Sequence, residues 1–228
     1  MKMAQKASSY HLYPQMDRGM MLIEHRRCFN EIIEFCNTLA YHGLLEAKKG
    51  FSVDMPFAPM QFELVSGSSK VMGPSRANTQ EANAIASWLA INGSILTNFY
   101  QQKENSAALE EKRSAKRIRL ADVVGIVTPF TGQKFELKRV LAKSGLDTSG
   151  MTIGTVHALQ GAERAVVLFS STYGENDAGK GYFFDRGVNM LNVAVSRAKD
   201  AFVLFGSVAV FNKSSSAPSS LLYRYITK

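Results

Sequence analysis

Three short segments in the second half of the chain combine residue types that suit contacts with phosphate and sugar groups. The first holds a threonine, a proline, an aromatic ring and a glutamine, and the second holds a threonine, a histidine, two glycines and a glutamate. The third ends on an arginine and a lysine, and arginine can stabilise the negative charge that spreads over phosphoryl oxygens during transfer. Short polar groups and aromatic faces also suit contacts with a nucleic-acid backbone and its bases. The segments are residues 128–133, 154–163 and 192–199.

Each segment also has a simpler structural explanation. Proline and glycine are ordinary turn residues, and an arginine that closes a helix interacts favourably with the helix dipole. Phe130 could equally be a core residue under its turn, and His157 could be a loop histidine with satisfied hydrogen bonds. The chemistry therefore depends on the segments occurring together and on where the fold places them.

Apolar runs that alternate with amphipathic stretches predict an α/β fold. Residues 123–127, 165–170 and 201–205 are nearly continuous apolar runs, which is typical of strands buried on both faces. Helices are predicted over residues 132–143 and along the apolar stripe of residues 190–198. This alternation predicts a parallel sheet with helices on both faces, and we expect the three segments at the carboxyl ends of its strands, where ligands bind. Further elements are predicted at residues 30–42, 62–65 and 151–155, and from the cap formed by Asn78 and Glu81.

Residues 174–181 come close to the phosphate-binding pattern G-x-x-x-x-G-K-S/T. The pattern fails at its last position, because Gly181 has no hydroxyl to bind Mg²⁺, and Glu175 and Asp177 would face the phosphates. We therefore predict a flexible loop here. For the same reason, we do not expect this chain to hydrolyse ATP alone.

The composition is that of a globular protein with a basic surface. The 228 residues are 46% hydrophobic and 20% charged, and the net charge of +8 favours a polyanionic partner. A solvated basic face gives the same charge, and residues 101–120 are predicted to form one. Two cysteines and four histidines, in no ligand spacing, predict no metal site. Without a long apolar run or a leader, the sequence predicts no membrane partner and a cytoplasmic location.

The order and spacing of these segments resemble the later motifs of superfamily 1 helicases. The most similar branch is the 5′-to-3′ branch that includes the nonsense-mediated-decay and replication helicases. Before the first predicted helix, Arg27 matches the arginine of motif IV, and the adjacent Arg26 leaves the register open by one residue. The other matches are residues 128–133 with the motif after the first core strand of the second RecA-like domain, residues 155–163 with motif V and residues 191–199 with motif VI.

The resemblance implies a fold and a division of the chain. It predicts a three-layer RecA-like α/β fold of the P-loop NTPase type, in which residues 22–228 form the second RecA-like domain. Residues 1–21 are then an N-terminal arm or the edge of a larger protein. Walker A, Walker B and the rest of the first RecA-like domain have no match in the chain, so that domain is an expected partner within the same protein.

For the nucleotide, the resemblance implies ATP with Mg²⁺, whose metal ligands are expected from the first RecA-like domain. Arg27 and Arg197 would be catalytic arginines that reach the γ-phosphate when the two domains close. Glu163 would contact the ribose and Gly161 would let the backbone approach the nucleotide. Gln160 completes the expected ATP-binding set.

For the nucleic acid, the resemblance implies a single strand bound without sequence preference, with DNA favoured over RNA. The expected contacts are Thr128, Pro129, Phe130, Gln133, Thr155 and His157. The chain is thus expected to be the C-terminal motor domain of an ATP-dependent helicase. The alternative is a nucleic-acid-binding module that kept the RecA-like fold without the motor. A Rossmann-type enzyme is disfavoured because no G-x-G-x-x-G is present.

Overall fold

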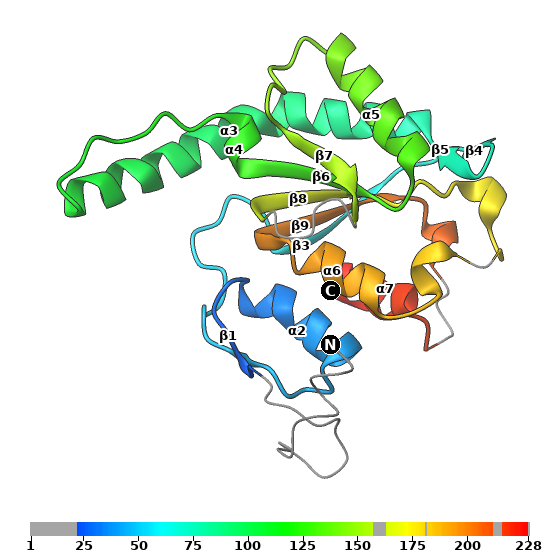
Figure 1. Cartoon of the computed structure of the whole chain (residues 1–228), viewed down its shortest axis with the longest axis horizontal. Helices are drawn as coiled ribbons and strands as arrows, with labels where there is room; N and C mark the ends of the chain where they lie inside the picture. Colours follow the sequence, from blue (N-terminus) through cyan, green and yellow to red (C-terminus); the bar gives the residue numbers. More distant parts are fainter. Residues whose placement is uncertain (1–21, 157–162, 181, 212–215, 228) are drawn as a thin grey trace, which may run out of the picture.

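A computed structural model describes residues 22–156, 163–180, 182–211 and 216–227. Its sheet consists of β3 (Met60–Leu64), β6 (Val124–Thr128), β7 (Thr152–Thr155), β8 (Arg164–Ser170) and β9 (Ala198–Gly206). These five strands lie in the order β3-β9-β8-β6-β7, and every neighbouring pair is parallel (Figure 1). The parallel sheet predicted from the apolar runs is therefore confirmed.

Helices cover both faces of this sheet (Figure 1). One face carries α3 (Thr79–Glu110) and α5 (Thr131–Lys143), and the other carries α2 (Asn30–Ala40), α6 (Asn189–Val195) and α7 (Pro218–Ile226). Successive strand residues point to opposite faces, so Ile126 belongs to the apolar core under α3 and α5 while Val127 belongs to the core on the other side. The three predicted layers are confirmed.

Short elements lie around the sheet. β1 (Glu24–His25) pairs in parallel with β2 (Glu46–Ala47). β4 (Lys70–Met72) and β5 (Ser75–Ala77) form an antiparallel hairpin just before α3. The remaining elements are α4 (Leu120–Val123) and the 3-10 helices Glu175–Asp177, Phe183–Asp185 and Val208–Val210.

Local signals set the helix ends close to where the sequence predicts them. The Asn78 side chain accepts a hydrogen bond from the Glu81 backbone N–H at 3.2 Å, which caps the start of α3. Gly43 and Gly145 have φ values of +79° and +74°, the left-handed conformation that follows α2 and α5. The far end of α3 projects from the body (Figure 1), and residues 109–117 are all exposed, which agrees with the solvated face predicted there.

The predicted helix over residues 190–198 is wrong at its end. α6 stops at Val195, and Ala198 begins β9, where it pairs with Arg164 of β8. Because a small apolar residue suits the start of a buried strand as well as a helical stripe, periodicity alone does not locate this boundary. Arg197 therefore lies in the turn between α6 and β9, and Lys199 lies in β9.

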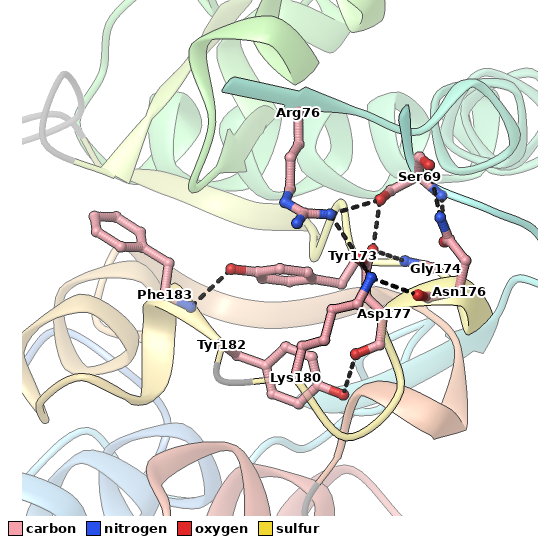
Figure 2. Close-up of polar contacts among 9 residues, drawn as sticks. All are labelled: Ser69, Arg76, Tyr173, Gly174, Asn176, Asp177, Lys180, Tyr182 and Phe183. Carbon is pink, nitrogen blue, oxygen red and sulfur yellow. Dashed lines mark hydrogen bonds and ion pairs between the residues drawn. The ribbon is translucent and has the colours of Figure 1, made fainter. Parts of the chain in front are cut away.

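The predicted flexible loop at residues 174–181 is wrong for residues 174–180, which form a packed turn. Asp177 is fully buried, and its carboxylate forms ion pairs with Arg76 at 2.6 Å and Lys180 at 3.2 Å (Figure 2). It also accepts a hydrogen bond from the Ser69 hydroxyl. A buried charge needs such partners, so this carboxylate fixes the turn against the segment that leads into β4. Lys180 is paired within its own turn, with a carboxylate that it shares with Arg76, and this is not the arrangement of a phosphate-binding loop.

Residues 1–21 lie outside the described residues, so the domain boundary at residue 22 stays a prediction. Within the described ranges, none of the helices has both the length and the apolar character needed to span a membrane.

Candidate functional site

A cleft of about 710 Å³ opens at the amino ends of β8 and β9. Glu163 lies immediately before β8, and Arg197 lies immediately before β9. A segment that leads into a parallel strand meets the sheet at its amino end, so the predicted placement of these two residues at the carboxyl ends is wrong. The charged residues that line the cleft are Arg26, Arg27, Arg197, Lys199, Glu24 and Glu163.

Glu163 forms ion pairs with two of the cations in this cleft. Its Oε1 lies 2.8 Å from Arg27 Nε, and its Oε2 lies 3.5 Å from Lys199 Nζ. All three side chains are partly exposed, so these ion pairs contribute little to stability and can be exchanged for contacts with another anion. Glu163 thus gathers two cations in the cleft without burying either of them.

The other two arginines of the cleft have different surroundings. Arg197 Nε donates a hydrogen bond to the Val193 carbonyl oxygen at 3.3 Å. In the described part of the chain, no carboxylate forms an ion pair with Arg197. Arg26 pairs with Glu24 at 2.7 Å and its side chain is 70% exposed. Arg27 is therefore the motif IV candidate that is joined to the centre of the cleft, while Arg26 is paired at its rim.

Backbone hydrogen bonds hold the segments that carry these charges. The Phe29 N–H donates to the Lys199 carbonyl oxygen at 3.0 Å, and the Arg164 N–H donates to the Arg197 carbonyl oxygen at 3.1 Å. The chain before α2, the start of β8 and the start of β9 are thereby tied together. The cations consequently extend from a fixed backbone framework.

His25 also lines the cleft and supports this framework. Its Nε2 accepts a hydrogen bond from the Cys28 N–H at 3.1 Å. Burial, and then the charge of Arg27, lower the pKa of His25, which favours the neutral ring that can accept this bond. Burial raises the pKa of the Cys28 thiol to about 12, so this cysteine is an inert core residue.

A second hollow, of about 850 Å³, lies at the carboxyl end of β6. Pro129 and Phe130, two of the predicted nucleic-acid contacts, line it. The Phe130 ring centroid lies 5.4 Å from that of Tyr173 and 5.9 Å from that of Phe183. We call this hollow the aromatic groove, and its other cationic and aromatic lining residues are Arg76, Phe135, Tyr173, Lys180, Phe183 and Arg186.

Two of the predicted nucleic-acid contacts lie beneath the surface. Thr128 and Gln133 are fully buried. The Thr128 hydroxyl lies 2.9 Å from the Thr172 hydroxyl. The Gln133 amide bonds to the backbone N–H and carbonyl oxygen of Asn78 and to the Ser170 hydroxyl. Their polar groups are satisfied within the domain, so neither side chain can reach a bound strand in this arrangement.

Four predicted site residues remain, and three of them lie outside the described part of the chain. Thr155 ends β7 and is partly buried. His157, Gln160 and Gly161 lie outside the described residues. Among the residues that are described, no group of three or more His, Cys, Asp or Glu side chains could hold a metal ion.

Buried polar residues beside the aromatic groove meet at Glu81, which the sequence marks only as a helix-capping position. Its carboxylate accepts hydrogen bonds from the Ser170 hydroxyl at 2.5 Å, the Ser171 hydroxyl at 2.7 Å and the Thr172 N–H at 2.8 Å. Burial raises the pKa of Glu81 to about 7, although these bonds oppose the shift. Thr172 has a φ of +72°, which a β-branched residue adopts only when it is held there. Glu81 thus fixes the turn that leads to Tyr173.

The cations of the aromatic groove were missed by the sequence reasoning. Arg76 lies on β5, Lys180 ends the packed turn, and Arg186 follows the 3-10 helix Phe183–Asp185. Long-range contacts bring them together, above all the pair between Arg76 and Asp177 (Figure 2). The only local signal was the mixture of aromatic and basic residues at positions 180–186.

A family model described as "AAA domain" matches residues 4–209. This chain belongs to that family. The regulator of nonsense transcripts 1 from Dictyostelium discoideum is 25% identical to it over 202 residues, which cover 82% of this chain and 13% of that protein. Helicase sen1 from Schizosaccharomyces pombe is 32% identical over 89 residues, which cover 37% of this chain and 5% of that protein. This chain therefore spans only a small fraction of the length of these two relatives.

Among solved structures, the C-terminal domain of a possible DNA helicase from Lactobacillus plantarum has a TM-score of 0.44 and 14% identity, covering 79% of this chain and 86% of that one. Membership of the AAA domain family and the likeness to regulators of nonsense transcripts confirm the predicted resemblance to the C-terminal region of superfamily 1 helicases. Together with the all-parallel sheet between two helical layers, they also confirm the predicted RecA-like α/β class.

Proposed function

We propose that this chain is the second motor domain of an ATP-dependent nucleic-acid helicase whose first RecA-like domain lies in the same protein. The observation that carries the proposal is the cleft in which Glu163 holds Arg27 and Lys199 beside Arg197. Four cations and two carboxylates line this cleft, so its charge fits a triphosphate. ATP and Mg²⁺ would be held by the first domain, and the γ-phosphate would face this cleft when the two domains close.

Arg27 and Arg197 are the residues we assign to the γ-phosphate. A guanidinium group keeps its charge and can donate two parallel hydrogen bonds to phosphoryl oxygens. Arg197 has no ion-pair partner in the described part of the chain, and the partner of Arg27 is itself partly exposed. Both side chains can therefore turn to a phosphate without leaving a buried charge unpaired. In related phosphoryl-transfer systems, such an arginine contributes roughly 10³ to 10⁵ in rate.

Glu163 is assigned to the ribose, with Gln160 and Gly161 as further contacts outside the described residues. A ribose hydroxyl that donates to Glu163 competes with Arg27 for the same carboxylate. Nucleotide binding would then release the Arg27 guanidinium toward the phosphate. Lys199 would keep Glu163 paired during this exchange, because it contacts the other carboxylate oxygen.

A single-stranded nucleic acid is the second ligand that we assign to this chain, and DNA is the first strand to test. The net charge of +8 favours a polyanion, and the aromatic groove offers rings and cations on one surface. Pro129 and Phe130 line the groove, and Thr155 and His157 stay candidate backbone contacts.

A nucleic-acid-binding module without motor activity is the second candidate. The aromatic groove favours it specifically, because the groove lies at the opposite end of the sheet from the cleft and does not need the cleft to bind a strand. Turnover of ATP separates the two candidates.

The experiment is to measure ATP hydrolysis by the longer protein that supplies the first RecA-like domain, with saturating single strands. Arg197→Ala should lower kcat by a factor of about 10³ or more, while the melting temperature and strand binding without nucleotide stay near wild type. Arg224→Ala removes an exposed arginine from α7 and should retain turnover. A destabilised Arg197→Ala protein with wild-type turnover per folded molecule would show that Arg197 serves the fold alone. Strand binding by a wild type that never hydrolyses ATP would favour the module without a motor.

A further inference from the structure

We propose that unpaired bases of a nucleic-acid strand bind in the aromatic groove, where Phe135 and Phe183 stack on the bases and Arg186 contacts the phosphate between them. This inference rests on the proposed function, which takes a single strand as the ligand and the aromatic groove as its surface, and it adds the residues that contact the bases and the phosphate. Phe135, Phe183 and Arg186 all lie outside the segments that resemble helicase motifs. Phe135 is two residues beyond Gln133, where one of these segments ends. The proposal therefore gives contacts with the strand to residues that the motifs leave without a role.

The walls of the groove come from two segments that a buried ion pair joins. Arg76 of β5 pairs with the buried Asp177 and also donates to the Ser69 hydroxyl at 3.0 Å (Figure 2). Asn176 and the Ser69 backbone exchange two hydrogen bonds, each of 2.9 Å. The Arg76 guanidinium lies 5.3 Å from the centroid of the Tyr173 ring. These contacts preform the groove, so a strand does not have to order its walls on binding.

The groove has a buried aromatic floor and an accessible aromatic rim. Tyr173 is only 4% exposed, and its hydroxyl accepts a hydrogen bond from the Phe183 N–H at 2.7 Å, which fixes both rings (Figure 2). Phe183 is half-buried, and Phe135 on α5 is 61% exposed. An exposed phenylalanine that lines a hollow is a surface on which a planar base can stack, whatever its sequence.

The groove carries a net positive charge, and among its described cations Arg186 is the one without an ion-pair partner. Arg76, Lys180 and Arg186 line the groove, and no carboxylate is among its described lining residues. Arg76 and Lys180 share the buried Asp177. Arg186 lies 5.3 Å from the centroid of the Phe183 ring and forms no ion pair with any described carboxylate.

The nearest carboxylate in sequence is directed elsewhere. Asp185 accepts hydrogen bonds from the N–H and the hydroxyl of Ser219, both at 2.7 Å. Arg186 is therefore an exposed, unpaired guanidinium beside an aromatic ring. A single strand presents the same alternation of a planar base and an anionic phosphate, whereas an acidic peptide presents the charge without the rings.

The test measures binding of labelled oligothymidylate and of an abasic strand of equal length by the 228-residue chain, at several salt concentrations. Phe135→Ala should bind oligothymidylate about tenfold more weakly and bind the abasic strand unchanged, because it removes a stacking surface and keeps every charged side chain of the groove. Arg186→Gln should weaken binding of both strands and reduce the salt dependence by about one counterion. Matched controls are Phe51→Ala and Arg224→Gln, which make the same changes at exposed positions outside the groove.

A second measurement locates the strand directly. Photocrosslinking of a strand that carries iodouracil should label peptides that contain Phe135 or Phe183. Labels confined to other peptides overturn the proposal, and so does wild-type binding by both groove variants. In those cases strand binding and the proposed motor role stand, because the chain still binds a strand, and only the assignment of the strand to the groove is lost. A wild-type chain that binds no strand even at low salt overturns both the groove and the nucleic-acid part of the proposed function.

Discussion

Arg27 Nε lies 2.8 Å from Glu163 Oε1, and this ion pair joins the segment before α2 to the residue that precedes β8. The adjacent Arg26 pairs instead with Glu24, at 2.7 Å. Two neighbouring arginines thus have different partners, one at the centre of the cleft and one at its rim. Substitution of one arginine therefore serves as the control for substitution of the other.

Arg27→Ala should reduce the kcat of the longer protein by orders of magnitude, because it removes a guanidinium from the proposed γ-phosphate contact. Arg26→Ala should leave kcat near wild type, since its charge is already paired at the exposed rim. Strand-stimulated phosphate release, measured beside the melting temperature, checks both. If Arg26→Ala proves the damaging change, the motif IV assignment is displaced by one residue.

The 228-residue chain alone should hydrolyse no ATP, with or without single strands. Its nearest approach to a P-loop ends in Lys180, which donates to the Asn176 carbonyl oxygen at 2.8 Å and pairs with Asp177. Phosphate release by repurified protein is the measurement, with Lys180→Ala as the matched variant. Turnover that survives repurification and disappears in Lys180→Ala would contradict this prediction.

Glu81 should make the stability of the fold depend on pH between about 4.5 and 7. Its pKa is raised in the folded state to about 7, so the folded protein keeps a proton that the unfolded chain releases. This contribution is fully present below pH 4.5, and it is lost as the pH rises through 7. The advantage of wild type over Glu81→Gln should shrink by up to about 3 kcal/mol across this range.

The comparison with Glu81→Gln isolates this group from other carboxylates. Hydrogen bonding to Arg139 lowers the pKa of Glu136 to about 2, for example, and this shift has the opposite effect on stability at low pH. Urea unfolding of both proteins at matched pH values supplies the difference. A difference that stays constant with pH would show that the pKa of Glu81 is not raised in the folded protein.

Gly132→Ala and Gly174→Ala should each destabilise the protein by about 1–3 kcal/mol, because a new Cβ would be forced against the backbone. At Gly132 the Cβ would lie 2.6 Å from the Arg76 carbonyl oxygen, and at Gly174 it would lie 2.5 Å from the Gly67 carbonyl oxygen. At Gly187 the new Cβ would meet no described atom within 4 Å, so Gly187→Ala should be neutral. Thermal melts of the three variants test whether these close approaches hold the walls of the groove.

The fold could be predicted from local signals because the three central strands of its sheet, β6, β8 and β9, are largely buried on both faces. The apolar run that became β6 and the helix that Gly145 ends are each visible within a short window of sequence. The end of α6 could not be predicted in the same way. Ala198 satisfies both a helical stripe and a buried strand, and only its pairing with Arg164 decides between them.

The candidate site could be predicted in part, because motif spacing identifies residue types and not their burial. Arg27 and Glu163 were predicted separately, and the structure shows that they contact each other. Thr128 and Gln133 have the polar groups expected of strand contacts, yet buried partners use those groups. The pairing of Arg76 with Asp177 could not be predicted, because no local pattern joins a hairpin to a turn so distant in the chain.

β8 has a mechanical consequence for the motor role that we propose. The strand begins one residue after Glu163 in the cleft and ends at Ser170, beside the turn that carries Tyr173 in the groove. Its seven residues span roughly 20 Å, and hydrogen bonds to β6 and β9 restrain it on both sides. A restrained central strand moves as one body. We therefore expect the distance that a bound strand advances to depend on the angle through which the whole domain rotates, and not on any rearrangement inside it.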